Sequence, residues 1–256
     1  MNDLVSIIMP NYNTSEYISD SIHSVINQTY TNWELIIVDD CSSDNSVELI
    51  RSFDDSRIRI YINEVNSGAA YSRNYALRKA KGRWIAFLDS DDLWHPDKLS
   101  KQVSFMIENG YHFSYTNYEI IDCLGNAQGV TVTGPKIITQ HGMYNYCWPG
   151  CLTVIYDANV AGLVQIENIK KNNDYAMWLK VIRFANCYLL DETLAFYRKG
   201  RSGSISTQSL KTLILWHFKL FYEAEKFSAF KSVLFTIRNI VFGTYKKIRY
   251  VRTTLK

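Results

Sequence analysis

The chain has 256 residues and a formal net charge of +3, with 47% hydrophobic and 21% charged residues. This ordinary composition excludes disordered, collagen-like and disulfide-scaffold proteins. The five cysteines form no C-x-x-C pair, no apolar run is long enough to cross a bilayer, and the N-terminus lacks the features of a secretory signal. We therefore expect a cytoplasmic protein, either soluble or bound at a membrane surface.

The first ninety residues alternate between short apolar runs and amphipathic stretches. Apolar runs predict buried strands at 5–9, 34–38, 58–62 and 84–88, and the intervening segments predict helices at about 18–26, 45–53 and 69–80. Strands that alternate with helices of this length indicate βαβ units. We therefore predict an α/β fold with a mostly parallel central sheet covered by helices on both faces.

The middle of the chain is less regular. The pattern predicts helices at 96–109 and 174–184, a strand at 112–115, a hairpin within 122–134, a loop at 134–150, an apolar segment at 152–156, and two short strands at 187–190 and 194–197. No internal repeat or low-complexity linker interrupts residues 1–208, which we therefore treat as one domain. Residues 209–256 are expected to form two helices.

The net charge of the whole chain conceals an asymmetry. Residues 209–256 carry ten Lys and Arg against two Glu, a net charge of +8, so residues 1–208 carry a net charge of −5. Because the body is acidic and no nucleic-acid recognition motif accompanies the basic tail, we expect no nucleic-acid partner.

Polar and acidic residues follow three of the predicted strands. They are Pro10, Asn11, Tyr12 and Asn13, then Asp39 and Asp40, and finally Asp89, Asp91 and Asp92. In a parallel sheet, ligands bind beyond the carboxyl ends of the strands, and carboxylates gathered there repel one another unless a cation lies between them. Mg²⁺ or Mn²⁺ completed by substrate phosphates suits such a site. The glycine-rich loops of dinucleotide-binding and P-loop enzymes are absent from the sequence, which argues against both classes.

An ordered set of motifs across residues 4–205 resembles glycosyltransferase family 2, whose members have the GT-A fold. The matching segments are 5–13 (VSIIMPNYN), 27–30 (NQTY), 34–43 (ELIIVDDCSS), Asn66-x-Gly68 with Ser72-Arg73-Asn74, and 87–92 (FLDSDD). The resemblance implies a single Rossmann-like domain with a nucleotide-binding half (1–92) and an acceptor-binding half (93–208). It also implies metal-dependent, inverting transfer from a nucleotide sugar, with UDP the expected nucleotide, to a glycan or lipid-linked glycan acceptor in bacterial surface polysaccharide synthesis.

The resemblance assigns roles to individual residues. Asp89-Ser90-Asp91 resembles the D-x-D motif, in which Asp89 faces the ribose and the metal and Asp91 binds the metal directly. Pro10, Tyr12 and Asp39 resemble the uracil and ribose contacts. The full set placed on the nucleotide is Pro10, Tyr12, Asn13, Asp39, Arg73, Asp89 and Ser90. If Arg73 has no such role, it is a solvated arginine on a helix face.

The resemblance also implies a general base and a diphosphate contact further along the chain. An acidic residue in a comparable motif is the base in the family, so Asp174 takes that role here, with Asn173 in place of the commoner acid. Alternatively, Asp174 is only a helix N-cap. The family often carries Tyr-Arg-x-His near the end of the domain. Residues 197–201 lack the His, so we expect Arg198 and Arg201 to contact the diphosphate electrostatically.

The basic tail contains an apolar stripe at three- and four-residue steps. Its members are Phe227, Phe230, Leu234, Ile237, Val241, Tyr245 and Ile248, and basic residues flank them. This pattern predicts peripheral binding to an anionic membrane on its cytoplasmic side. The alternative is a helical pair packed on the catalytic domain or on a second subunit of a homo-oligomer. For the whole chain, a catalytically inactive nucleotide-sugar-binding subunit is the alternative, but such a protein has no use for a base.

Overall fold

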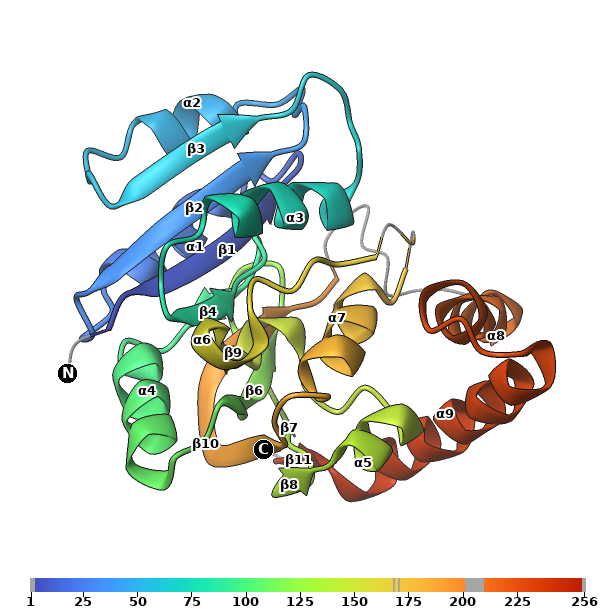
Figure 1. Cartoon of the computed structure of the whole chain (residues 1–256). Coiled ribbons are helices and arrows are strands. Elements are labelled where there is room, and N and C mark those ends of the chain that lie inside the picture. Colours follow the sequence, from blue (N-terminus) through green and yellow to red (C-terminus); the bar gives the residue numbers. More distant parts are fainter. Residues whose placement is uncertain (1–2, 168, 170, 201–209, 255–256) are drawn as a thin grey trace.

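The computed structural model describes residues 3–167, 169, 171–200 and 210–254. Within these residues, eleven strands form one sheet (Figure 1). Eight of them lie in the order β11 (Val251–Thr253), β7 (Ala127–Val132), β6 (Phe113–Ile121), β9 (Ile155–Asp157), β4 (Trp84–Phe87), β1 (Val5–Asn11), β2 (Trp33–Asp39) and β3 (Ile58–Ile62). The other three are β10 (Cys187–Arg198), which pairs with β6, and the two-residue strands β5 (Leu93–Trp94) and β8 (Ile137–Ile138), which pair with β10. The first half of the chain supplies one end of the sheet, and the second half supplies the other.

The first half contains the predicted βαβ units. Its elements are β1 (Val5–Asn11), α1 (Ile18–Ile26), β2 (Trp33–Asp39), α2 (Ser46–Arg51), β3 (Ile58–Ile62), α3 (Ala69–Lys79) and β4 (Trp84–Phe87). Strand β1 is parallel to both β2 and β4, and β2 is parallel to β3. The ends of β1, β2 and β4 therefore meet at one edge of the sheet, where the predicted site residues follow them.

Two hydrophobic cores cover the two faces of this sheet, because successive strand residues point to opposite sides. Ile7 and Ile37 pack with α1 and with α4 (Lys98–Asn109) on one face. Ile8 and Ile36 pack with α3 and with α7 (Asn173–Val181) on the other. The prediction of helices on both faces is confirmed.

The second half adds antiparallel strands to the parallel core. Strand β9 (Ile155–Asp157) is antiparallel to both β4 and β6 (Phe113–Ile121), so β6 runs in the same direction as β4. Strand β10 (Cys187–Arg198) is parallel to β6. The expected hairpin joins β6 to β7 (Ala127–Val132). The sheet as a whole is thus mixed. Its parallel pairs are β4–β1, β1–β2, β2–β3 and β6–β10, and its other pairs are antiparallel.

Several local predictions in this half were wrong. The expected loop at 134–150 contains β8 (Ile137–Ile138) and α5 (Gln140–Asn145). The two expected strands at 187–190 and 194–197 are one strand, β10, whose register against β6 shifts between Leu190 and Ala195. The exposed Asp191 lies in that irregularity, which explains the polar break in the sequence. The remaining short elements are β5 (Leu93–Trp94), the 3₁₀ turn η1 (Cys151–Thr153) and α6 (Ala158–Ala161).

The tail forms the two expected helices and also extends the sheet. Helix α8 (Leu210–Lys219) continues into a π-helical turn, η2 (Leu220–Ala224), and α9 (Ala229–Arg249) leads into β11 (Val251–Thr253), which pairs with β7. Figure 1 shows α8 and α9 side by side at one end of the molecule, in red. None of the helices within the described ranges is both long enough and apolar enough to span a bilayer.

Helix α9 carries its apolar stripe on the outside. Phe227, just before the helix, turns inward and packs on Tyr144 and Phe221. The other six stripe residues are exposed: Phe230, Leu234, Ile237, Val241, Tyr245 and Ile248. The buried positions of α9 are instead Ser232, Thr236, Asn239 and Lys246. The helix therefore does pack on the domain, as in the alternative prediction. Its packing face combines these buried polar positions with the aromatic rings of Phe235 and Phe242, which pack against the core.

Candidate active site

The carboxylate of Asp39 is fully buried at the end of β2. It accepts hydrogen bonds from the Ser42 backbone N–H at 2.9 Å, the Ser42 hydroxyl at 2.6 Å and the Asn11 side-chain amide at 2.6 Å. An ionised carboxylate offers about four acceptor positions. Three donors thus hold the Asp39 carboxylate in one orientation at the end of β2.

The loop after β1 is joined to the loop after β2. Asn13 has a left-handed backbone (φ 48°), and its side-chain oxygen accepts from the Ser43 N–H at 2.8 Å. Pro10 is buried within β1, whereas the side chain of Tyr12 is 47% exposed at the turn. Tyr12 is therefore available as a stacking surface, and Pro10 positions the backbone that leads to it.

Asp40 has a structural role that sequence reasoning missed. Its carboxylate accepts from the Asn63 side chain at 2.7 Å and from the backbone N–H groups of Ser67 and Gly68 at 2.9 and 2.7 Å. These bonds fix the loop that leads into α3, the helix that carries Arg73. Its place beside Asp39 at a strand end was the signal available in the sequence.

Arg73 joins three segments at the centre of the site. Its side chain is buried, and its guanidinium donates to the Asp89 carboxylate at 2.5 Å and to the Asn173 side-chain oxygen at 3.0 Å. Burial alone would lower the pKa of Arg73, but the negative charges of Asp89 and Asp174 raise it above its ordinary value. Arg73 is thus a permanent cation between two carboxylates, not a solvated surface arginine.

Asp174 lies in the first turn of α7. The N-cap of that helix is Asn172, which has a left-handed backbone (φ 57°), so the alternative that Asp174 is merely the N-cap is wrong. One oxygen of Asp174 accepts from the Tyr175 N–H at 2.8 Å. Burial raises the pKa of Asp174 above its ordinary value even though the charge of Arg73 opposes the shift. A carboxylate with a raised pKa is suited to accept a proton.

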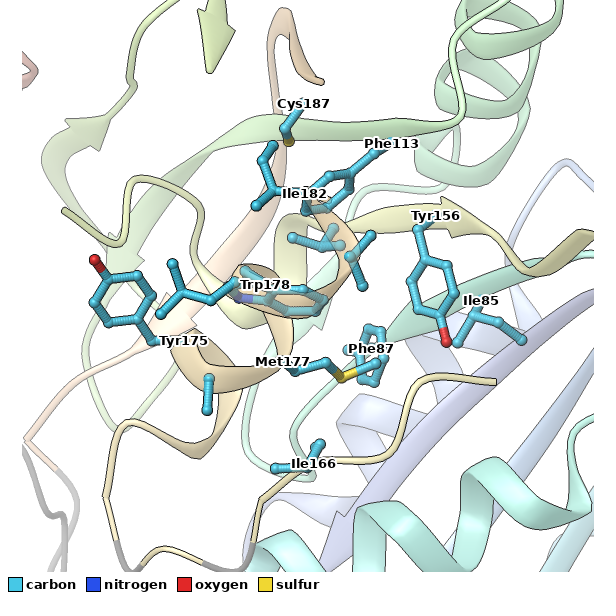
Figure 2. Close-up of a cluster of buried hydrophobic side chains, with 14 of the residues drawn as sticks. Ile85, Phe87, Phe113, Tyr156, Ile166, Tyr175, Met177, Trp178, Ile182 and Cys187 are labelled. Carbon is cyan, nitrogen blue, oxygen red and sulfur yellow. The ribbon is translucent and has the colours of Figure 1, made fainter. Parts of the chain in front are cut away.

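Aromatic packing locks α7 against β4. The ring of Trp178 meets Phe87 edge-on at a centroid distance of 5.2 Å and lies 5.9 Å from the ring of Phe113 (Figure 2). Asp89 comes two residues after Phe87, and Asp174 one helical turn before Trp178. This core contact therefore fixes the two carboxylates relative to each other.

Arg198 contacts the D-x-D segment and the residue that follows it. Its backbone N–H donates to the Asp92 carboxylate, and its guanidinium donates to the backbone carbonyls of Asp91 and Cys123, each at 2.8 Å. The side chain is almost fully buried. This geometry fits a residue that shapes the loop, so the expected contact of Arg198 with diphosphate stays a prediction. Arg201 lies outside the described residues.

The D-x-D carboxylates are candidates for holding a divalent ion. Ser90 is buried between them and accepts from the Thr14 hydroxyl at 3.1 Å, while Asp91 is 9% exposed. No cluster of three or more His, Cys, Asp or Glu side chains that could hold a metal occurs in the described part of the chain. Two carboxylates fit Mg²⁺ or Mn²⁺ only where phosphate oxygens and water complete the coordination shell. The residues present thus suit an ion that arrives with a diphosphate.

Comparison with known proteins decides the family. Residues 6–147 match the family model of glycosyl transferase family 2. The chain belongs to this family. It is accordingly a transferase enzyme with the α/β architecture expected from the resemblance, in which the candidate site lies at the carboxyl edge of the β1, β2 and β4 strands.

Two bacterial glycosyltransferases are similar to this chain over most of their length. The chain is 42% identical to TuaG of Bacillus subtilis (strain 168), whose name links it to teichuronic acid biosynthesis, over 81% of this chain and 83% of the relative. It is 43% identical to WfgD of Escherichia coli over 82% of each chain. WfgD is named a UDP-Glc:alpha-D-GlcNAc-diphosphoundecaprenol beta-1,3-glucosyltransferase.

Two solved structures share the fold at low identity. S. aureus TarS 1–349, crystallised with UDP-GlcNAc, superposes with a TM-score of 0.71 at 19% identity, over 96% of this chain and 74% of TarS. The mannosyltransferase PcManGT from Pyrobaculum calidifontis, in complex with GDP-Man and Mn²⁺, gives a TM-score of 0.65 at 16% identity, over 92% and 69% of the two chains. These likenesses establish the GT-A type of fold.

Proposed function

We propose that this enzyme transfers a sugar, with inversion of configuration, from a UDP-sugar to a hydroxyl of a diphospholipid-linked glycan in bacterial surface polysaccharide synthesis. The observation that carries the proposal is the cluster in which Arg73 lies between Asp89 and Asp174. The donor nucleotide and the acceptor class follow the name of WfgD, the relative with 43% identity.

In the chemical step, Asp174 acts on the acceptor and Asp89 faces the nucleotide of the donor. The acceptor hydroxyl attacks the anomeric carbon, and a new C–O bond forms as the bond to the diphosphate oxygen breaks on the opposite face. The hydroxyl proton passes to the Asp174 carboxylate, and UDP leaves with the bonding electrons. Arg73 keeps Asp89 oriented toward the nucleotide and balances the charge of Asp174, which favours the ionised base.

The negative leaving group requires positive charge nearby. Asp89 and Asp91 would hold Mn²⁺ or Mg²⁺, which when bound supplies that charge to the diphosphate. Asp39 and Tyr12 would contact the base and ribose: three hydrogen bonds fix Asp39 at the end of β2, and Tyr12 is exposed in the turn after β1. Support for a divalent ion comes from the D-x-D carboxylates and from the Mn²⁺ complex of the neighbouring mannosyltransferase structure.

We also propose that the protein binds the cytoplasmic face of the membrane through α9. The exposed stripe includes Phe230 at 83% and Ile248 at 79% exposure, which is unusual for large apolar side chains on one helix face. Helix α9 contains five basic residues and no acidic one. An apolar face with basic flanks suits an anionic bilayer, where a lipid-linked acceptor would be found.

The test is release of UDP from a panel of UDP- and GDP-sugars, with GlcNAc-diphospholipid as acceptor, in the presence of Mn²⁺ or of a chelator. We expect turnover with one or a few UDP-sugars, abolished by chelation and restored by Mn²⁺ or Mg²⁺. Turnover with GDP-sugars alone would contradict the donor assignment, and full activity in chelator would contradict the metal. No turnover with any donor would overturn the proposal.

A further inference from the structure

A groove of about 580 Å³ lies between the β6–β7 hairpin and the second half of α9. Strand β11, which pairs with β7, contributes one side. Its lining residues are Tyr118, Ile120, Gln128, Val130, Val132, Tyr146, Lys199, Gly243, Lys246, Lys247 and Val251. Neither the D-x-D carboxylates nor Asp174 lines it, so the groove is separate from the nucleotide residues described above.

The groove opens at the same edge of the sheet as the active site. Strand β6 runs in the direction of β4, and Tyr118 and Ile120 lie in its carboxyl half. Lys199 directly follows Arg198, whose backbone N–H donates to the Asp92 carboxylate. A ligand in the groove therefore lies on the acceptor side of the D-x-D segment, next to the residues that shape it.

The charge of the groove is positive throughout. Three lysines line it, and no carboxylate is among the described residues that do so. Lys246 is 9% exposed and donates to the Trp148 carbonyl at 2.7 Å, its one hydrogen-bond acceptor among the described residues. An ammonium group has three N–H donors, so two remain for a ligand. Its other contact is the ring of Tyr146, whose centroid lies 5.4 Å from Nζ. A buried ammonium with one hydrogen-bond acceptor and one aromatic ring favours an anion in the groove.

The groove also has an apolar part, to which Ile120, Val130 and Val132 contribute. Helix α9 lines the groove through Gly243, Lys246 and Lys247, whereas its exposed apolar stripe lies on nearly the opposite side of the helix. The apolar lining beside the lysines therefore comes from β6 and β7, and it suits a short hydrocarbon segment attached to an anion.

We propose that this groove binds the diphosphate and the first isoprene units of the lipid-linked acceptor, with Lys199, Lys246 and Lys247 on the diphosphate. The inference rests on the proposed function, because it names the site of that acceptor. It places the glycan end toward Asp174 and the lipid end along Ile120, Val130 and Val132.

Binding of a short, soluble mimic tests the groove without requiring turnover. Farnesyl diphosphate is titrated into the full-length protein and into the variant Lys199→Gln/Lys247→Gln, in which both changed side chains are exposed. We expect affinity to fall at least about tenfold, since one charge-assisted hydrogen bond accounts for roughly that factor. The control Lys81→Gln/Lys136→Gln makes the same change of charge elsewhere and should bind as the wild type does.

Competing ligands separate the possible anions. Inorganic pyrophosphate should bind more weakly than farnesyl diphosphate, and vesicles of phosphatidylglycerol should not displace the mimic from the groove. Equal affinity for pyrophosphate would overturn the lipid part of the proposal. Displacement by phosphatidylglycerol would make the groove a general headgroup site, and unchanged affinity in the groove variant would overturn the proposal entirely.

UDP binding, measured on the same samples, distinguishes this proposal from the proposed function. The groove variant should bind UDP normally and show a raised KM for the lipid-linked acceptor with an unchanged KM for the donor. If wild-type protein transfers sugar to that acceptor but does not bind farnesyl diphosphate, the groove assignment alone is wrong. If no acceptor is glycosylated yet the lysine-dependent binding is present, the proposed function fails and the groove remains a lipid diphosphate site.

Discussion

Arg73 and Asp89 form an ion pair at 2.5 Å in which Arg73 is buried and Asp89 is partly exposed, and the same guanidinium reaches Asn173, the neighbour of the proposed base. The pair links α3 to the chain just after β4, while Asn173 opens α7. Without Arg73, the Asp89 and Asp174 carboxylates would lose the cation whose charge acts on both. Their mutual repulsion would then favour protonation.

Arg73→Gln should therefore shift the pH dependence of catalysis. Burial raises the pKa of Asp174 and Arg73 lowers it, so loss of the cation raises it further. The base must be ionised to act, and the acidic limb of the kcat–pH profile is expected to move to higher pH. Arg73→Lys keeps the charge and should leave the limb near its wild-type position. A limb that stays unmoved in Arg73→Gln would show that Asp174 is not the titrating group.

Asp174→Asn should abolish most catalysis without weakening donor binding. The amide keeps the size of the side chain but cannot accept the acceptor proton, and loss of a general base costs roughly 10²–10⁴-fold in kcat. Single-turnover rates and the Kd for UDP measure the two effects separately. The exposed Asp54→Asn serves as control and should behave as the wild type does. A normal rate in Asp174→Asn would exclude this residue as the base.

The nucleotide-binding half was predictable because its signals are local. Each strand from β1 to β4 is a short apolar run, and each observed boundary lies within about two residues of the expected one. Strand β11 gave no such signal, because Val251 joins the sheet only through its pairing with Val132, more than a hundred residues earlier. Strand β10 was split in two because its bulge places polar residues where a strand normally shows apolar ones.

The site was predictable only in part, for a related reason. Asp39 and Asp89 could be placed at one edge because parallel strands end together. The contact between Arg73 and Asn173 spans 100 residues and depends on α7 packing against β4 through Trp178 and Phe87. No local pattern encodes that packing. Without the sheet topology, Arg198 could not be recognised as a buried support of the D-x-D loop.

Lys98 is expected to make stability depend on pH. Its side chain is fully buried in α4, with its ammonium on the Gln102 oxygen at 2.9 Å and 4.2 Å from the ring centroid of Trp94. Burial lowers the pKa of Lys98 to about 7, far below that of the unfolded chain. Between pH 7 and 9, the unfolded chain binds a proton that the native protein lacks, so this residue makes stability rise with pH.

Lys98→Met isolates this contribution, because Met has a similar length and no charge. The wild type should gain free energy of unfolding relative to the variant by up to about 1.4 kcal/mol per pH unit between pH 7 and 9. Urea unfolding at three pH values measures the difference. Lys246, with a pKa lowered by burial to about 8, is present in both proteins and cancels in the comparison. A difference that is constant with pH would mean that Lys98 stays charged in the native state.

The apolar stripe of α9 should determine membrane binding. Ile237→Ser/Val241→Ser removes two residues that are 54% and 60% exposed, and deletion of the whole tail is less informative because it also removes β11. We expect affinity for phosphatidylglycerol vesicles to fall roughly tenfold or more, as the loss of buried hydrocarbon predicts, with UDP binding unchanged. Ile107→Ser/Leu124→Ser changes two residues outside the tail that are 45% and 82% exposed, and this variant should bind vesicles normally. Light scattering measures the oligomeric state of both proteins. If the wild type is an oligomer, and the stripe variant is a monomer that still binds vesicles, the stripe contacts a second copy of the chain instead of the bilayer.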